Sequence, residues 1–221
     1  MPAIVLTYGE YEESAQQEVG SETWKHRRVA NVLAGYAKVL LGHIPESYTI
    51  GDLGNVSRST FEEALTESSP EALFFFGHGL EGPDGGFQGK ESTLVLDSAN
   101  LHLLKGAILY AVACWSAAGF GAIAADLGAS VLGYREQLWV PLREPFVSRM
   151  RPAVLSGALV LLEGKPLSQA FTTTAQEYKT LAQALFTEGT AAKAMAAFVM
   201  MNVESLALLG NGQRTLTRLT S

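Results

Sequence analysis

The sequence predicts an α/β fold in which a mostly parallel central sheet is covered by helices on both faces. Short apolar runs, typical of buried strands, alternate along the chain with longer segments of helical hydrophobic periodicity. Hydrophobic residues make up 48% of the 221 residues and charged residues 17%, which is ample for a core. The chain shows no internal repeat and no low-complexity linker, so residues 1–221 are expected to form a single domain.

Five apolar runs are the predicted strands of this sheet. Each is short, rich in Val, Ile, Leu, Phe or Tyr, and bounded by glycine or polar residues. They are residues 3–6, 48–50, 72–76, 107–113 and 130–134. Residues 93–96 are expected to form a small hairpin strand. The alternating tail, residues 205–219, is expected to add an edge strand.

The predicted helices carry recognisable start and stop signals. Ser21 offers an N-cap followed by an acidic first turn, and Ser59 opens a second helix with similar chemistry. Gly164 and Pro166 end a long apolar helix. The segments between these elements, residues 9–20 and 80–89, are rich in polar residues or glycine and are predicted loops. That long apolar helix is expected at residues 146–163. Further helical segments are expected at residues 98–104 (a short turn), 116–127, 167–185 and 190–203.

Charge and composition exclude several classes of function. The net charge of −6 and the isoelectric point near 5.3 argue against nucleic acid, which requires a basic surface. The single cysteine, Cys114, excludes an intrachain disulfide framework and suits a reducing compartment. No apolar stretch reaches the roughly 18 residues of a membrane span, and the N-terminus lacks a basic signal-peptide region. We therefore expect a cytoplasmic protein with neither a nucleic acid nor a membrane partner.

The most informative residues follow the third and fourth predicted strands. His78 comes just after residues 72–76, and Cys114 directly after residues 107–113. Open α/β sheets build their sites at the carboxyl edge, where these residues would meet. A lone cysteine is more commonly a small core residue, but a thiol beside an imidazole is a nucleophile with a general base. Their paired placement predicts a catalytic dyad of His78 and Cys114.

Three segments resemble the caspase-like cysteine peptidases, in particular the bacterial CHAT-type and the clostripain and gingipain branches. Residues 74–79 look like the apolar strand that ends in His-Gly in that family, and residues 112–117 look like its nucleophile strand, Ala-Cys-x-Ser. The tail Leu-Leu-Gly-Asn-Gly at residues 208–212 is similar to the Leu-Leu-Gly-Asp-Pro segment of many bacterial members.

The chain also departs from the caspase pattern. Val112 and Ser116 replace the first and last residues of the pentapeptide Gln-Ala-Cys-[RQG]-Gly. The histidine-to-cysteine gap is shorter than the roughly 50 residues of caspases.

The resemblance implies a caspase-hemoglobinase-like three-layer sandwich and a cysteine endopeptidase. In that family the backbone N–H groups of the glycine after the histidine and of the cysteine form the oxyanion hole, which implies Gly79 and Cys114 here. The implied partner is a protein substrate. Small bacterial relatives commonly serve antiviral defence, for instance by cleaving a gasdermin-like pore-forming protein. Two alternatives stay open, namely a catalytically silent caspase-like scaffold and an unrelated flavodoxin-like module that binds a small ligand.

The pocket for the residue before the cut is expected to include Val112, Arg135 and Glu136. Val112 is apolar, and the two opposite charges are expected to offset each other. An uncompensated buried charge on the substrate would be costly there. The expected preference is therefore an apolar residue such as leucine, followed by arginine or lysine if Glu136 points inward, and by aspartate through Arg135.

Other candidate binding residues find less support. Three other histidines do not follow a predicted strand and are expected on the surface or on helix faces: His26, His43 and His102. His102 is the one most easily mistaken for a catalytic residue, because it lies between the two strands that carry His78 and Cys114. The glycine-rich loop lacks the lysine-serine pair of a phosphate-binding loop. Acidic residues around it lack the regular spacing of a calcium loop. No metal or other cofactor is therefore expected.

Overall fold

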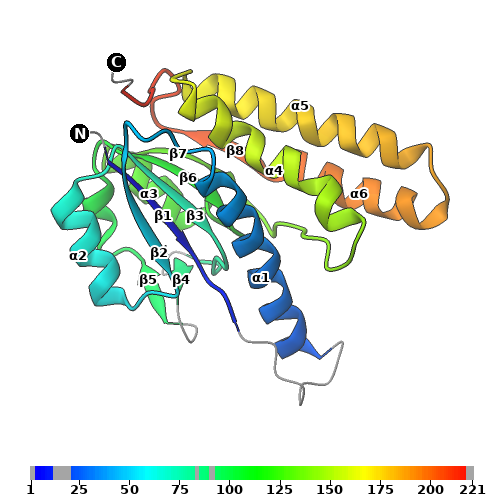
Figure 1. Cartoon of the computed structure of the whole chain (residues 1–221), viewed down its shortest axis with the longest axis horizontal. Coiled ribbons are helices and arrows are strands. Elements are labelled where there is room, and N and C mark those ends of the chain that lie inside the picture. Colours follow the sequence, from blue (N-terminus) through cyan, green and yellow to red (C-terminus); the bar gives the residue numbers. More distant parts are fainter. Residues whose placement is uncertain (1–2, 12–20, 83–84, 90–92, 218–221) are drawn as a thin grey trace.

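The computed structural model describes residues 3–11, 21–82, 85–89 and 93–217. These residues form a six-stranded sheet with helices packed on its two faces (Figure 1). The strand order is β2-β1-β3-β6-β7-β8; all neighbours are parallel except β7 and β8. With helices on both faces, this arrangement confirms the predicted α/β fold class. The strands are β1 Ala3–Tyr8, β2 Thr49–Gly54, β3 Ala72–Phe76, β6 Ile108–Val112, β7 Ser130–Tyr134 and β8 Leu206–Leu209.

The central strands β3, β6 and β7 are buried along their whole length. Parallel strands covered on both faces read as continuous apolar runs, which is why these three matched the prediction closely. The edge strand β2 continues past the predicted residues 48–50 through Asp52 and two glycines, most of it partly exposed. The predicted edge strand in the tail exists as β8, which is antiparallel to β7.

Two hydrophobic cores lie on opposite sides of the sheet. One side carries the longer helices α1 Glu22–Leu41, α4 Phe146–Leu162, α5 Leu167–Phe186 and α6 Thr190–Ser205 (Figure 1). The other side carries α2 Arg58–Ser68, α3 Gly119–Asp126, the short 3-10 helix η2 Leu101–Leu104, and a hairpin of β4 Phe87–Gln88 and β5 Leu94–Leu96.

Elements on the other side of the sheet also differ from the prediction. Ser57, and not Ser59, caps α2, since its hydroxyl accepts the N–H of Thr60. Helix α3 begins at Gly119 instead of residue 116, because the residues before it form a turn that follows Cys114. Part of the predicted loop at residues 80–89 pairs as β4. Of the predicted loops, residues 12–20 and 83–84 lie outside the described residues.

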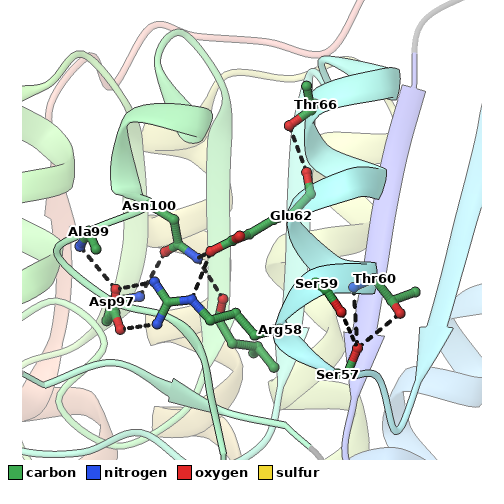
Figure 2. Close-up of polar contacts among 10 residues, drawn as sticks. Ser57, Arg58, Ser59, Thr60, Glu62, Thr66, Asp97, Ala99 and Asn100 are labelled. Carbon is green, nitrogen blue, oxygen red and sulfur yellow. Dashed lines mark hydrogen bonds and ion pairs between the residues drawn. The ribbon is translucent and has the colours of Figure 1, made fainter.

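A polar network ties α2 to the segment between β5 and η2 (Figure 2). The Arg58 guanidinium donates to both carboxylate oxygens of Asp97 and, at 2.8 Å, to Glu62. Asn100, nearly fully buried, donates to Glu62 and to the carbonyl of Val95, each at 2.8 Å. The Arg58 hydrogen bond holds the pKa of Asp97 below its ordinary value. The network anchors the long connection between β3 and β6 to the body of the fold.

Candidate active site

The pairing of β3 with β6 brings His78 and Cys114 to the same edge of the sheet. Phe76 lies opposite Val112 in this register, and the Gly77 N–H donates to the Val112 carbonyl at 3.2 Å. His78 and Cys114 each follow this pair by two positions, at the carboxyl ends of neighbouring parallel strands. This edge is where open α/β sheets carry their sites.

Gly79 lies directly against the backbone of Cys114. A Cβ atom built on Gly79 would lie 1.9 Å from the Cys114 carbonyl oxygen, a contact that no side chain tolerates. Glycine is therefore required here by close backbone approach. The loop that carries His78 and the loop that carries Cys114 are in contact.

Among the described residues, two backbone N–H groups at this contact have no backbone acceptor. Gly79 forms an isolated antiparallel bridge with Phe87, flanked by hydrogen bonds of 2.9 and 3.0 Å that their neighbours make. Gly79 therefore sits in a non-hydrogen-bonded pair, and its N–H is not used by the bridge. Within the described ranges, neither this N–H nor that of Cys114 donates to another backbone group. The Cys114 N–H is near its own sulfur, which it affects electrostatically.

A tight turn follows Cys114. Trp115 has a φ of 52°, a left-handed conformation that is uncommon for a residue with a side chain. Its N–H donates to the Glu136 carbonyl at 3.0 Å. The buried Ser116 hydroxyl accepts the Tyr134 N–H at 2.9 Å and donates to the Ala113 carbonyl at 2.8 Å. Ser116 thus satisfies the backbone of the turn that presents the cysteine.

The Cys114 thiol is half-buried and bound by the backbone of Leu138. Its sulfur accepts the Leu138 N–H at 3.3 Å, and its S–H donates to the Leu138 carbonyl at 3.8 Å. Burial raises the pKa of the Cys114 thiol above its ordinary value, while the backbone N–H groups of Leu138 and of Cys114 itself act in the opposite direction. The thiol is therefore protonated at neutral pH.

The His78 ring is bound by the first helix. Its Nε2 lies 2.8 Å from the backbone carbonyl of His26, and the two imidazole rings stack with centroids 3.5 Å apart. Since a carbonyl only accepts, Nε2 carries the proton and Nδ1 is left as an acceptor. Burial, followed by the nearby His26, lowers the pKa of His78 to about 4. The ring is therefore neutral at pH 7.

The thiol and the imidazole each form hydrogen bonds with a different residue and not with one another. Among the hydrogen bonds of the described residues, none joins the sulfur of Cys114 to the ring of His78. The structure thus presents a neutral thiol and a neutral imidazole at the same edge of the sheet and not an ion pair. Catalytic hydrogen bonds are commonly long or misaligned before substrate binds.

His26 and Leu138 are the residues of this site that the sequence did not indicate. His26 was expected on the surface or on a helix face; it lies on α1, and its half-buried ring stacks on His78, a contact that was not expected. Leu138 contributes only backbone atoms, which any residue type would supply. Both contacts depend on how distant elements pack against the strand ends, so no local pattern points to them. His43 and His102 are exposed, as expected.

Of the three residues expected around a substrate pocket, one is buried and two are exposed. Val112 is 1% exposed and belongs to the hydrophobic core, so its side chain does not line a surface pocket. That expectation was wrong because the strand is covered on both faces. Arg135 and Glu136 are exposed, and the Glu136 carbonyl contacts Trp115. In the described part of the chain, Arg135 and Glu136 form no ion pair with each other.

The described residues hold neither a metal-binding cluster nor a membrane-spanning helix. In residues 3–11, 21–82, 85–89 and 93–217, no three His, Cys, Asp or Glu side chains gather in a way that could hold a metal ion. Over the same ranges, every helix is too short or too polar to cross a lipid bilayer.

Comparisons with known proteins give one kind of match. No family model matches the sequence, and no curated protein is similar to it. Among solved structures, the chain is similar to the Drosophila initiator caspase Dronc, with a TM-score of 0.46 and 12% identity. The match covers 97% of this chain and 81% of that one. Similarity at this level assigns no activity.

Proposed function

We propose that this protein is a cysteine endopeptidase of caspase-like fold, with Cys114 as the nucleophile and His78 as the general base. The observation that supports this most directly is the contact between Gly79 and Cys114 at the carboxyl edge of the sheet. One small region thereby holds a thiol, a neutral imidazole and two N–H groups without backbone acceptors. Acyl transfer requires these three kinds of group together.

The first chemical step forms the acyl enzyme. A substrate carbonyl binds with its oxygen toward the N–H groups of Gly79 and Cys114. The sulfur attacks the carbonyl carbon while its proton passes to Nδ1 of His78, whose Nε2–H stays bonded to the His26 carbonyl. The developing oxyanion is stabilised by the two N–H groups. The imidazolium then protonates the leaving amine, the C–N bond breaks, and a thioester remains on Cys114.

The second step releases the product. Water attacks the thioester carbonyl and loses a proton to Nδ1 of His78. The intermediate collapses, the C–S bond breaks, and the proton returns to the sulfur as the acid product leaves. Because both groups begin neutral, proton transfer accompanies attack and no thiolate–imidazolium pair precedes it.

The finer assignments are part of the same proposal. The Ala-Cys-x-Ser motif and the tail at residues 208–212 favour the bacterial CHAT-type branch, and with it a cytoplasmic role in antiviral defence with a gasdermin-like pore-forming protein as substrate. The half-buried Trp115 and Trp139, next in sequence to the thiol and to its backbone partner, favour an apolar residue before the cut.

A labelling and cleavage assay tests the proposal. A peptide acyloxymethyl ketone should label Cys114, and a fluorogenic peptide library varied before the cut should be hydrolysed with a preference for leucine. Substitution C114A should abolish both reactions. Cleavage that persists in C114A would contradict the assignment, and a preference for aspartate or for arginine and lysine would contradict the apolar pocket.

One observation favours a second candidate, a catalytically silent scaffold. No hydrogen bond joins the Cys114 thiol to His78 among the described residues, as expected for a site that does no chemistry. The scaffold predicts that no peptide in the library is cut and that the acyloxymethyl ketone reacts no faster than with a free thiol. The two outcomes separate the candidates directly.

A further inference from the structure

We propose that Asn202 is a positioning residue for the Cys114 thiol, acting through the backbone of Leu138 and Trp139. The proposal deepens the cysteine peptidase function given above and rests on it, since a donor to this sulfur matters most if the sulfur is a nucleophile. Its test reads the thiol itself and does not require peptide cleavage.

Asn202 holds both backbone groups of a single residue. It lies near the end of α6 and is 0% exposed. Its Oδ1 accepts the Trp139 N–H at 2.8 Å, and its Nδ2 donates to the Trp139 carbonyl at 2.9 Å. Trp139 belongs to a segment outside any helix or strand, so these two bonds take the place of a sheet ladder. A buried amide paired in this way fixes the position of its partner.

A second contact on the same helix face supports the first. Phe198, one helical turn before Asn202, stacks on the Trp139 ring with centroids 5.1 Å apart and planes 8° apart. Helix α6 therefore holds Trp139 by its ring and by its backbone.

The segment held in this way carries the N–H that reaches the sulfur. Leu138 precedes Trp139, and its side chain is buried in the core. Among the described residues, the hydrogen bonds between the Cys114 sulfur and a distant part of the chain are both made with Leu138. The Leu138 carbonyl shares a peptide unit with the Trp139 N–H that Asn202 binds, and the Leu138 N–H lies one Cα atom further along the chain. A shift of Trp139 would therefore displace both Leu138 groups that contact the sulfur.

The chemistry of the contact depends on the charge of the sulfur. When the thiol loses its proton, the bond to the Leu138 carbonyl disappears and the bond from the Leu138 N–H becomes charge-assisted. This N–H therefore stabilises the thiolate selectively and opposes the effect of burial. Loss of the Asn202 hydrogen bonds should raise the pKa of Cys114 and lower the fraction of thiolate.

The test is the pH dependence of Cys114 alkylation by iodoacetamide, followed by mass spectrometry. Cys114 is the single cysteine, so the rate has one source. In N202L, which keeps the bulk and removes both hydrogen bonds, we expect the profile to move up by about one pH unit and the rate at pH 7 to fall about tenfold. F198L, which loses only the ring stack, should shift the profile less and in the same direction.

The matched control is N100L. Asn100 is also nearly fully buried and makes three hydrogen bonds, but it lies on the other side of the sheet. It should lower the melting temperature without moving the alkylation profile. A folded N202L with the parent profile, or an equal shift in N100L, would overturn the proposal. If N202L does not fold, an unchanged profile in F198L overturns it. A parent protein that cuts no peptide would refute the proposed function while leaving these rates measurable.

Discussion

The two sides of the candidate site are held by different parts of the chain. His78 is bound by α1, through the carbonyl and the ring of His26, and its loop pairs with the β4 strand. Cys114 is bound by elements from the second half, through the Ser116 turn against Tyr134 and the Leu138 backbone. The proposed base and the proposed nucleophile should therefore respond to different substitutions. Changes in α1 should alter the pKa of the imidazole, and changes in α6 should alter the pKa of the thiol.

Removal of either reacting group should have the largest effect. We expect C114A and H78A each to lower kcat/KM for a library peptide by about a thousandfold or more, and the double variant to be little worse, because the two groups act as a unit. Both variants should keep the parent far-UV circular dichroism. H102A, which changes an exposed histidine at a distance from the strand ends, is the control and should keep most activity. Normal turnover by C114A would refute the assignment.

The second largest effect on activity is expected where the His78 loop contacts the Cys114 loop, at Gly79. In G79V a side chain would meet the Cys114 carbonyl, so the loop must move and its N–H must leave the oxyanion position. We expect kcat to fall by roughly a hundredfold or more, the scale of losing one oxyanion donor. G189A is the control, since nothing lies within 4 Å of a Cβ atom at that glycine. Turnover of G79V within a few-fold of the parent would show that Gly79 does not line the site.

The pH dependence of activity isolates the imidazole side. His78 acts as a base only when neutral, and its pKa is lowered to about 4. As pH falls from 7, kcat/KM should stay level through the ordinary histidine range near 6.5 and decline only as the pH approaches 4.

Substitution H26A sharpens this reading. It opens the ring of His78 to water and removes a neighbouring positive charge, so the acid limb should move upward toward 6.5. H43A, at an exposed histidine, should leave the profile unchanged. A parent acid limb near 6.5, or one that H26A does not move, would contradict the buried, stacked environment of His78.

The sequence predicted the central sheet and the two strand ends well, because fully buried parallel strands leave continuous apolar runs such as residues 72–76 and 130–134. It predicted less at the edge, where β2 is stabilised by pairing with β1 and needs no apolar run. It also missed the turn at Trp115, because the left-handed conformation there depends on hydrogen bonds to residues far along the chain.

The candidate site divides in the same way. His78 and Cys114 were indicated by their residue types at two strand ends, and Gly79 by the family resemblance. The hydrogen bonds that hold the imidazole and the thiol come from His26 and Leu138, and in both cases a backbone atom makes the bond. Every residue type has the same backbone groups, so the sequence does not indicate which of them will bind a side chain. Only the packing of α1 and of the segment after β7 shows that the backbones of His26 and Leu138 do so.

The smallest effect is expected from the network on the far side of the sheet. In R58A, Asp97 loses its guanidinium partner and Glu62 one of its two partners, while Asn100 keeps its bond to Val95 (Figure 2). We expect the free energy of unfolding to fall by about 1–2 kcal/mol, the scale of a partly exposed charge-assisted pair.

The pH dependence of this loss has a definite sign. Because the pKa of Asp97 is lowered in the folded protein, its contribution is present at neutral pH and disappears as the pH falls through the folded value. The stabilities of R58A and of the parent should therefore converge in acid, as urea unfolding at several pH values would show. The alkylation profile of Cys114 should not change in R58A, since the network contacts neither the thiol nor Leu138. A shift of that profile would mean that the two sides of the sheet are coupled, and that the connection between β3 and β6 transmits the change to the site.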